Sequence, residues 1–331
     1  MSGLPRTVSF VIPTMDEQET VRTLVEKIAE VCEELGLEFD VIFIDDGSAD
    51  QTWTRIVDVA EDYPQVRGIR FRRNFGKAAA LSAGFAEATG DVVFTMDADL
   101  QDDPVEIPAF LEKLEEGYDV VSGWKQKRKD ALDKTLPSKV FNRLVSRLTG
   151  VRLNDHNCGF KAYRQAVTKD VVLYGERHRF VPVLAAARGW RIGEVPVVHH
   201  AREFGRSKYG FERLAKGFLD LLSVFFLTHF GRRPFHLVGA IGLLCFLTGG
   251  AGMVYLTVRK TLPYIFEMEE FLLHKSALFY YCITALLLGA QLFLAGLIAE
   301  LIVSLSDQAR RPYNVAERTD TAETRYEVET V

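Results

Sequence analysis

Asp91-Val92-Val93-Phe94-Thr95-Met96-Asp97-Ala98-Asp99 says most about how this chain folds and what it binds. The run from Asp91 to Met96 is short and apolar, which predicts a buried strand. Asp97 and Asp99 follow at its carboxyl end, separated by the small Ala98. Mg²⁺ and Mn²⁺ prefer oxygen ligands, and diphosphate oxygens fill their remaining positions, so this pair predicts a site for a metal and a nucleotide. Acidic pairs also cap strands and helices in many proteins, so the neighbouring sequence has to decide.

Strands and helices are predicted to alternate on both sides of this stretch. Apolar runs predict strands at residues 8–12, 41–44, 66–71, 91–96 and 119–122, and helical spacing predicts helices at 17–34, 52–60, 78–88 and 107–116. This βαβα order predicts an α/β fold with a mostly parallel sheet and helices on both faces.

The residues that follow four of the predicted strands are suited to ligand binding. They are Pro13-Thr14, Asp45-Asp46-Gly47-Ser48, Arg72-Arg73-Asn74 and Asp97-Ala98-Asp99. Ligands of such sheets bind beyond the carboxyl ends of the strands, so we expect the four loops to meet there. The chain has no G-x-G-x-x-G after its first predicted strand and no Walker A loop, which argues against a dinucleotide-dependent dehydrogenase and a P-loop enzyme.

Two long apolar stretches predict a membrane hairpin. Residues 235–258 contain no Asp, Glu, Lys or Arg, and residues 277–305 contain one Glu. About 20 apolar residues cross the hydrocarbon core of a bilayer. A pair of buried core helices is the alternative, but little sequence surrounds these stretches to cover them. We therefore predict an integral membrane protein.

Charged residues around the spans predict the topology. Arg232-Arg233 precede the first span and Arg310-Arg311 follow the second, whereas the connecting residues 259–276 carry three Glu. Basic flanks favour the cytosolic side, so both termini are predicted to be cytosolic. No apolar stretch typical of a signal peptide follows residues 1–6, so the α/β part is expected to stay in the cytosol.

These features divide the chain into four segments. They are an α/β domain at 1–210, an amphipathic juxtamembrane helix at 211–232, the transmembrane hairpin at 233–310 and a polar tail at 311–331 that is predicted to be disordered. Helical spacing places Phe211, Leu214, Phe218, Leu221, Leu222 and Phe225 on one face of the second segment. Such a face is typical of a helix that lies among lipid headgroups, with internal packing as the alternative.

The charged residues and the cysteine spacing limit which ligands and partners the chain is expected to bind. The net charge is −5, and the four cysteines show no C-x-x-C spacing, which favours a reduced compartment without a disulfide or zinc framework. The basic group Lys125–Lys129 predicts a phosphate or headgroup contact, whereas Lys139, Arg143 and Arg147 have the spacing of a solvated helix face. Nucleic acid is not expected, because interleaved aromatic residues are missing. His199-His200 would point to opposite faces of a strand, which favours a structural role.

Six motifs occur in an order that resembles one enzyme family. They are Val11-Ile12-Pro13-Thr14-Met15-Asp16-Glu17, Ile44-Asp45-Asp46-Gly47-Ser48, Arg73-Asn74-Phe75-Gly76-Lys77, Asp97-Ala98-Asp99-Leu100-Gln101, Asn157-Cys158-Gly159-Phe160-Lys161 and Arg206-Ser207-Lys208-Tyr209-Gly210. The set resembles family 2 glycosyltransferases of GT-A fold, and among them the polyisoprenyl-phosphate glycosyltransferases, which include dolichol-phosphate mannose synthase. The resemblance covers residues 6–312, with the hairpin. Residues 14–17 depart from it, since relatives often have an aromatic residue and Asn before the Glu.

The resemblance implies a donor site for a nucleotide-sugar. Pro13, Glu17, Asp45, Lys77, Asp97 and Ala98 would bind a UDP- or GDP-sugar, and Asp97, Asp99 and Gln101 would hold Mg²⁺ or Mn²⁺ against its diphosphate. A metal at this place stabilises the departing nucleoside diphosphate. Asp46 and Ser48 have the alternative of capping the helix that follows, and we favour capping for Ser48.

The resemblance also implies a lipid phosphate acceptor. Arg128, Arg202, Arg206, Ser207 and Lys208 would bind that phosphate, to which Arg donates bidentate hydrogen bonds. The second pKa of a phosphomonoester is about 6, so its oxygen is already ionised and a strong base is not essential. Asp155 and Asp99 would be catalytic. Asp155 would act as base, orienting group or stabiliser of positive charge at the sugar, with helix capping as the alternative.

The resemblance therefore implies an inverting, metal-dependent glycosyltransferase of cell-envelope glycan biosynthesis in the bacterial cell membrane. It would move a sugar from a nucleotide-sugar to undecaprenyl or dolichyl phosphate at the cytosolic membrane face. A processive polysaccharide synthase is a first alternative, disfavoured because the Gln-x-x-Arg-Trp motif is missing, and a non-catalytic nucleotide-sugar-binding scaffold is a second. The expected partners are donor, acceptor and lipid bilayer, and the spacing of Ala285 and Gly289 leaves a homo-oligomer open.

Overall fold

The computed structural model describes residues 7–126, 132–171, 173, 175, 177–200, 212–230, 233–266 and 272–307. The chain forms two compact units, Met1–Thr228 and His229–Val331. The boundary falls within residues 211–232, for which the sequence predicts a juxtamembrane helix. The first unit is α/β and the second is helical.

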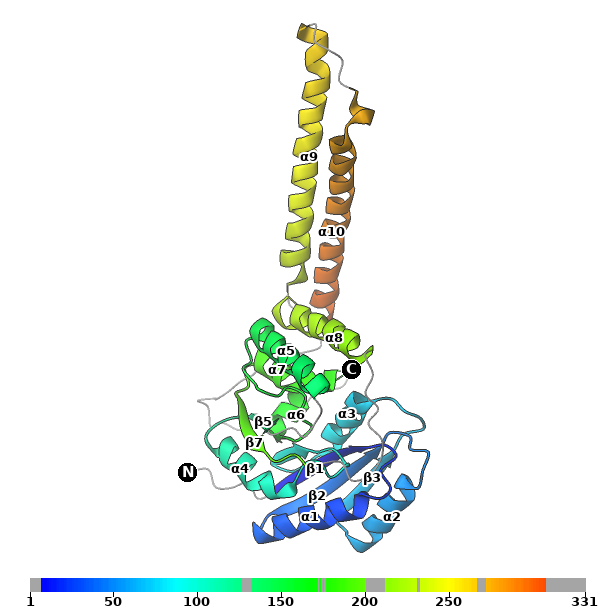
Figure 1. Ribbon diagram of the computed structural model, residues 1–331, viewed down its shortest axis with the longest axis vertical. Helices are drawn as coiled ribbons and strands as arrows, with labels where there is room; N and C mark the ends of the chain where they lie inside the picture. The colour runs from blue at the N-terminus through cyan, green and yellow to red at the C-terminus, as the bar shows by residue number, and fades with distance from the viewer. Residues whose placement is uncertain are drawn as a thin grey trace, which may run out of the picture. The chain divides into compact units, whose positions relative to one another are not determined.

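A seven-stranded sheet organises the first unit (Figure 1). Its strands are β1 (Thr7–Thr14), β2 (Glu38–Asp45), β3 (Val66–Arg70), β4 (Val92–Thr95), β5 (Val120–Lys125), β6 (Lys161–Arg164) and β7 (Ile192–Val197), in the order β3-β2-β1-β4-β6-β5-β7. Neighbouring strands are parallel except that β6 runs antiparallel to β4 and β5. The predicted α/β class and the mostly parallel sheet are confirmed, whereas β6 and β7 were not predicted.

Helices cover both faces of the sheet. They are α1 (Val21–Glu34), α2 (Thr52–Asp62), α3 (Lys77–Glu87), α4 (Ile107–Glu115), α5 (Leu132–Thr149), α6 (Gln165–Asp170), α7 (Val181–Ala187) and α8 (Glu212–His229), with 3₁₀ turns η1 (Pro104–Glu106) and η2 (Arg177–Phe180). Apolar side chains of α1, α2 and α4 form one buried cluster with the sheet, and those of α3, α6 and α7 form the other. The core therefore lies in two layers, as hydrophobic burial on both faces of a parallel sheet requires.

Helix α8 packs inside the first unit through one edge. Its Leu221 and Val224 are buried in a third cluster with Val145 of α5, Phe180 and Val183. Leu219 and Leu222 of the same helix are 61% and 54% exposed. Internal packing thus accounts for part of the apolar face of α8, and contact of the exposed edge with lipid stays a prediction.

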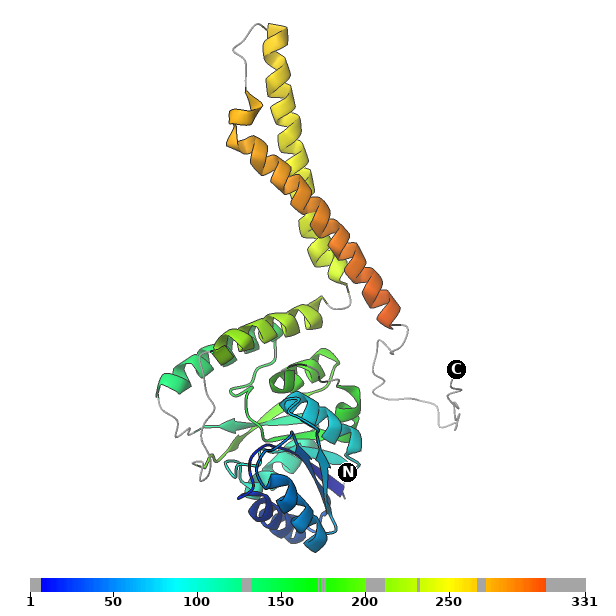
Figure 2. The same ribbon diagram turned by 90° about the vertical axis from the view of Figure 1, so that its right-hand side faces the viewer.

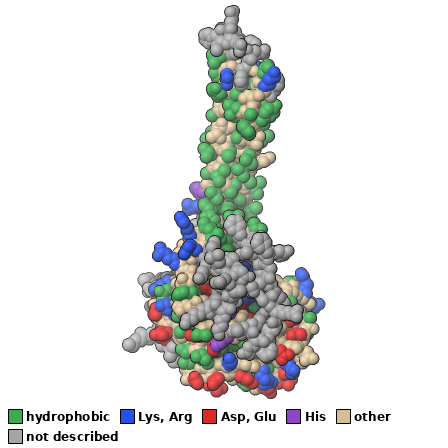
Figure 3. Space-filling model, in the orientation of Figure 1, with side chains coloured by type: hydrophobic (Ala, Val, Ile, Leu, Met, Phe, Trp, Pro, Cys, Tyr) green, Lys and Arg blue, Asp and Glu red, His purple; other side chains and the backbone are tan. Residues whose placement is uncertain are grey.

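The second unit is a helical hairpin of α9 (Pro234–Phe266) and α10 (Ala277–Asp307), with the 3₁₀ turn η3 (Leu273–Lys275) just before α10 (Figure 2). Pro234–Leu262 and Ala277–Val303 are long and apolar enough to cross a membrane. Only 17% and 11% of the residues in their most apolar 18-residue stretches are buried. Apolar side chains cover their visible surface (Figure 3). The alternative of buried core helices is therefore wrong for the described structure.

Glycines bring the two hairpin helices into close contact. A Cβ atom on Gly242 would lie 2.8 Å from the carbonyl oxygen of Gly289, and a Cβ on Gly289 would lie 2.8 Å from that of Gly242. Small residues at such crossings let backbones approach, which favours packing in lipid. The sequence pattern around Gly289 therefore serves contact within the chain.

Candidate active site

The carboxyl ends of the parallel strands bring the predicted loops together. Thr14 pairs with Asp45 across β1 and β2, and Asp45 pairs with Arg70 across β2 and β3. Strand β4 lies on the other side of β1 and ends at Thr95, just before Asp97. The expectation that these loops share one edge of the sheet is confirmed.

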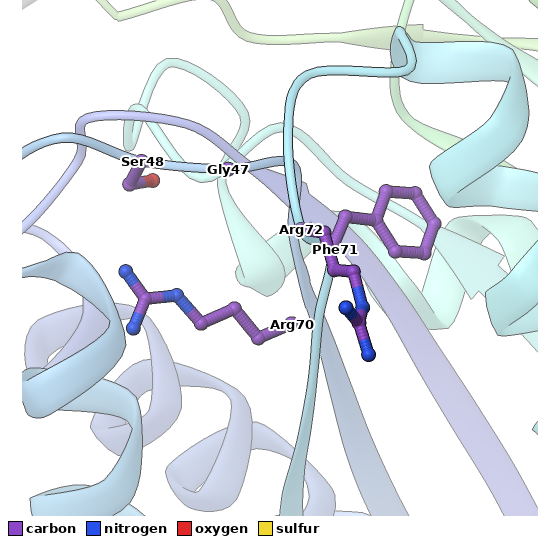
Figure 4. Close-up of a pocket in the computed structure, with 5 residues that line it drawn as sticks. All are labelled: Gly47, Ser48, Arg70, Phe71 and Arg72. Carbon is purple, nitrogen blue, oxygen red and sulfur yellow. The ribbon is translucent and has the colours of Figure 1, made fainter.

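Asp45 lies beside an open cleft at this edge. Its side chain is fully buried, Oδ1 accepts a hydrogen bond from the backbone N–H of Ser48 at 2.9 Å, and Oδ2 lies 3.2 Å from Nε of Arg70. The cleft has a volume of about 470 Å³ and is lined by Gly47, Ser48, Arg70, Phe71 and Arg72. Arg70 and Phe71 point in opposite directions, as successive residues of an extended strand do (Figure 4).

Asp46 clamps the loop that leads into α3. Its Oδ1 accepts from the N–H of Phe75 at 2.7 Å and its Oδ2 accepts from the N–H of Gly76 at 2.9 Å. Gly47 permits this approach, because it has a φ of +79° and a Cβ there would lie 2.6 Å from the carbonyl carbon of Arg73. The clamp fixes the start of α3, where Lys77 is the first residue.

Ser48 does not cap α2, so that prediction is wrong. Helix α2 begins at Thr52 with Gln51 at the N-cap, and the N–H of Thr52 donates to Oδ1 of Asp50 at 2.9 Å. The hydroxyl of Ser48 instead accepts from the N–H of Asp16 at 3.0 Å. Ser48 therefore ties the loop after β1 to the loop after β2.

The loop after β1 carries Pro13 and Glu17 to the same edge. Asp16 has a φ of +55°, and its Oδ1 accepts from the N–H of Ala49 at 3.0 Å. The N–H of Glu17 donates to the hydroxyl of Thr52 at 2.9 Å. Helix α1 therefore begins at Val21 and not at residue 17 as predicted, because residues 15–18 bind the neighbouring loop.

Asp97 is held ionised by the cations around it. Burial alone would raise its pKa, but the amine of Lys77, which pairs with Oδ1, and the nearby Lys125 and Lys161 hold the pKa well below its usual range. Ala98 beside it is buried. The structure thus brings together Asp97, Lys77 and Ala98 from the predicted donor site.

Asp99 and Gln101 follow in a tight turn. Leu100 has a φ of +57°, and Oδ1 of Asp99 accepts from the N–H of Gln101 at 3.2 Å. The side chain of Gln101 donates to the carbonyl of His200 at 3.4 Å. Both candidate ligands are half-buried, so their oxygens remain near the surface of the site.

Asp102 and Lys125 form an ion pair beneath this turn that the sequence did not reveal. The Asp102 side chain is fully buried and its Oδ1 lies 2.9 Å from the Lys125 amine. Burial alone would lower the pKa of Lys125, but Asp102 raises it above its usual value. Lys125 therefore neutralises a buried carboxylate, and its predicted phosphate contact is not needed to explain it.

His200 has a structural contact as well. Its Nε2 lies 2.9 Å from Oδ2 of Asp103, and its backbone N–H donates to the carbonyl of Gln101 at 3.0 Å.

Within the described part of the chain, no three His, Cys, Asp or Glu side chains gather as metal ligands. A cation at Asp97 and Asp99 would hence draw further ligands from the donor diphosphate and water, and two carboxylates with an amide oxygen suit Mg²⁺ or Mn²⁺.

Asp155 is buried beside β5, where its carbonyl lies 3.5 Å from the hydroxyl of Ser122. It lies between α5 and β6 in a segment without helix or strand, and its Oδ1 accepts from the N–H of Asn157 at 3.0 Å. The helix-cap alternative is wrong, since the next helix, α6, begins only at Gln165. Asp155 shapes a local turn, and its catalytic role stays a prediction.

The residues predicted to bind the acceptor phosphate lie outside the described part of the chain, as do residues 308–331. They are Arg128, Arg202, Arg206, Ser207 and Lys208. Arg143 and Arg147 on α5 are exposed, in agreement with a solvated face. Sequence reasoning missed the clamp by Asp46, since a carboxylate before Gly47 has no spacing that identifies its distant partners.

Residues 9–172 match the family described as Glycosyl transferase family 2. The chain is 37% identical to dodecaprenyl-phosphate galacturonate synthase of Rhizobium johnstonii, covering 89% of this chain and 87% of that protein. It is 35% identical to undecaprenyl-phosphate 4-deoxy-4-formamido-L-arabinose transferase of Klebsiella pneumoniae, covering 92% of this chain and 90% of that protein.

Solved structures share the fold of the first unit. Glucosyl-3-phosphoglycerate synthase of Mycobacterium tuberculosis, in complex with Mn²⁺, UDP and glucosyl-3-phosphoglycerate, matches with a TM-score of 0.54 at 18% identity. The match covers 67% of this chain and 80% of that one. The GT-A-like architecture and the family resemblance of the motifs are both confirmed. The chain belongs to glycosyl transferase family 2 and is a glycosyltransferase.

Proposed function

We propose that this enzyme transfers a sugar from a nucleotide-sugar to a polyprenyl phosphate at the cytosolic membrane face, with inversion at the anomeric carbon. One observation carries the proposal. The first unit ends at Thr228 of 331 residues, so relatives named for polyprenyl-phosphate chemistry that cover 89% and 92% of the chain also align with the hairpin unit. A lipid-linked acceptor explains the hairpin unit, because the hairpin would anchor the enzyme in the bilayer that contains the acceptor.

The donor would bind along the edge from Asp45 to Asp97. Oδ2 of Asp45 is buried and faces Nε of Arg70 at 3.2 Å, but it accepts no well-formed hydrogen bond from the described residues, so a base or ribose group in the cleft would satisfy it. Pro13 and Glu17 border the same edge. Lys77, oriented by the Asp46 clamp, would lie against the diphosphate.

Asp97 and Asp99, with Gln101, would hold Mg²⁺ or Mn²⁺. When bound, the cation neutralises charge that develops on the departing nucleoside diphosphate. The cations around Asp97 keep its carboxylate ionised, as a metal ligand has to be, and Lys77 would leave Oδ1 for the diphosphate when the metal binds. Lys77 adds a second positive charge on the leaving-group side.

For the acceptor phosphate, binding in the site matters more than deprotonation by a base. Its oxygen is largely ionised near neutral pH, because the second pKa is about 6. We assign phosphate binding to Arg128, Arg202, Arg206, Ser207 and Lys208, and we assign to Asp155 the orientation of the acceptor or the stabilisation of positive charge at the sugar. The hairpin would span the bilayer with both termini in the cytosol, and a homo-oligomer stays open.

Transfer by purified protein tests the proposal. Full-length protein in detergent is supplied with radiolabelled UDP- or GDP-sugars and undecaprenyl phosphate, and labelled lipid is extracted. Label in the organic phase that depends on the lipid phosphate is the expected result. Label in a long polymer would favour the polysaccharide synthase, and donor binding without any turnover would favour the non-catalytic scaffold.

A further inference from the structure

The segment that carries Asp155 is buried although it belongs to no helix or strand. Leu153, Asp155 and His156 are 6%, 2% and 0% exposed. Buried backbone groups need hydrogen-bond partners, and a segment outside the sheet has no ladder to provide them. Side chains from two neighbouring elements supply the partners instead.

Glu194 on β7 supplies the partners on one side. Its Oε1 accepts from the N–H of Asn154 at 2.9 Å and from the N–H of Asp155 at 3.0 Å. Its Oε2 accepts from Nδ2 of Asn154 at 2.7 Å and from the N–H of Asn154 at 3.1 Å. One carboxylate thus binds two successive backbone N–H groups, and such charge-assisted hydrogen bonds are stronger than neutral ones.

Helix α5 supplies the partners on the other side. Nδ2 of Asn142 donates to the carbonyl of Asn154 at 2.9 Å, and the hydroxyl of Ser146 donates to the carbonyl of Leu153 at 3.2 Å. Asn142 and Ser146 are four residues apart, so they lie on the same face of the helix. The segment is therefore held between β7 and α5.

His156 completes this arrangement as a neutral imidazole. Its Nε2 lies 3.0 Å from the hydroxyl oxygen of Ser146. The single hydrogen of that hydroxyl serves Leu153, so Nε2 carries the hydrogen and donates it to Ser146. Burial and the nearby Lys161 lower the pKa of His156 to about 4, in agreement with a neutral ring.

We infer that Glu194 is a positioning residue for the reaction, because it fixes the backbone of Asp155, to which we assign the orientation of the acceptor or the stabilisation of positive charge at the sugar. Glu194 lies on β7 beside Ser122 of β5, so the rigid sheet determines where it stands. Asn142, Ser146 and His156 hold the opposite side of the segment. The inference rests on the proposed function of Asp155, and it extends the site to a strand that no predicted motif includes.

Two substitutions at Glu194 test the inference in the full-length protein. Glu194→Ala removes all four hydrogen bonds, and it should lower kcat about 10- to 100-fold, since a displacement of about 1 Å at a catalytic group costs this much. The KM for the nucleotide-sugar should change less than about threefold, because the donor edge is untouched. Glu194→Gln keeps one oxygen that accepts from both N–H groups, and the Asn154 amide can turn its oxygen toward the new NH₂ group, so this variant should recover most of kcat.

A matched control separates positioning from stability. Asp91 lies at the opposite end of β4 from Asp97, and its Oδ2 accepts from the N–H and hydroxyl of Thr7 at 3.3 and 3.0 Å. Asp91→Ala should lower Tm comparably and leave kcat unchanged. Equal losses of kcat in Asp91→Ala and Glu194→Ala, measured below both Tm values, would overturn the inference.

A double-mutant cycle with Asp155→Asn gives the sharpest result. If Glu194 acts through Asp155, adding Glu194→Ala to Asp155→Asn should lower kcat less than about twofold further. The same fold loss in both backgrounds would show that Glu194 acts independently of Asp155 and would overturn its positioning role. Wild-type protein that transfers no sugar to polyprenyl phosphate would instead refute the proposed function, before any variant is compared.

Discussion

A Cβ atom on Gly159 would lie 2.6 Å from Oδ2 of Asp97. The backbone before β6 therefore touches the carboxylate after β4, and the carbonyl of Gly159 also accepts from the hydroxyl of Thr95 at 2.9 Å. Because β6 runs antiparallel to β4, its start meets the end of β4. Glycine is the residue that leaves room for the Asp97 carboxylate.

Gly159→Ala should therefore displace Asp97. We expect turnover to fall about 100-fold, because the displaced Asp97 carboxylate would no longer be placed to bind the metal. Overpacking should also lower the free energy of unfolding by about 1–3 kcal/mol. Measurement of kcat and Tm checks this. Gly250→Ala is the control, since a Cβ there would have no neighbour closer than 3.9 Å. Wild-type kcat in Gly159→Ala would contradict the assignment of Asp97 to the site.

Asp99→Asn should abolish turnover while the fold stays intact. The amide keeps the size of the side chain but loses the negative charge that a divalent cation prefers. Activity of the wild type should vanish in EDTA and return with Mg²⁺ or Mn²⁺, measured as labelled lipid product. Full activity in EDTA would exclude the metal assignment.

Asp46→Asn should loosen the loop before Lys77. An amide has one acceptor oxygen and would turn its NH₂ group toward one of the two N–H donors of Phe75 and Gly76. We expect a loss of about 1–3 kcal/mol, as for other buried unsatisfied donors, and a higher KM for the nucleotide-sugar. Asp50→Asn in the same loop is the control, because Asn replaces Asp well at the start of a helix. Equal effects of the two substitutions would contradict the clamp.

The stability of the protein should fall as pH drops below about 6.5. Burial lowers the pKa of His156 from 6.5 to about 4. Between these values the unfolded chain binds a proton that the native His156 does not, so acidification favours unfolding by about 1.4 kcal/mol per pH unit for one such group. His178, whose pKa is lowered to about 3, acts in the same direction.

His156→Gln should therefore weaken this pH dependence. Its amide can still donate to Ser146, and it does not titrate. Comparison of Tm at pH 7 and pH 5 should show a smaller decrease in the variant than in the wild type. Equal decreases would show that His156 is not the titrating group.

A topology measurement tests the hairpin in the membrane. A protease-cleavable tag inserted between residues 267 and 271 should be cut only from outside the cytosol. The basic residues before the first helix and after the second favour the cytosol for both ends of the hairpin, which leaves the connection between the helices outside. A tag at the carboxyl terminus should be protected from the same protease. Cleavage of the inserted tag from the cytosolic side would refute the topology.

The first half of the sheet was predictable because its signals are local. Strands β1, β2, β4 and β5 contain apolar runs, whereas β3 mixes Val and Ile with Arg and Gly, and each of the first four strands is followed by a helix. The two long apolar helices, α9 and α10, were predictable for the same reason. Strand β6 has only four residues, Lys161–Arg164, and its buried Lys161 gives it no apolar pattern to detect.

The candidate site was predictable as a set of loops but not as a set of contacts. Asp97 and Asp99 were recognisable from their place after a strand. The partners of Asp46 and Glu194 lie about 30 and 40 residues away in the sequence, and only the folded sheet brings them together. Ser48 was misassigned because hydroxyl side chains before a helix usually cap it, whereas here the hydroxyl binds the neighbouring loop.

The order of the elements along the chain has a consequence for biosynthesis. The last strand of the sheet ends at Val197, and the first apolar helix begins at Pro234. At about 5–20 residues per second, a ribosome adds the residues between them in about two to seven seconds. The sheet thus has time to close before the apolar helices are made, and α8 is complete at His229, just before them, so the first unit would be able to fold ahead of the proposed membrane insertion.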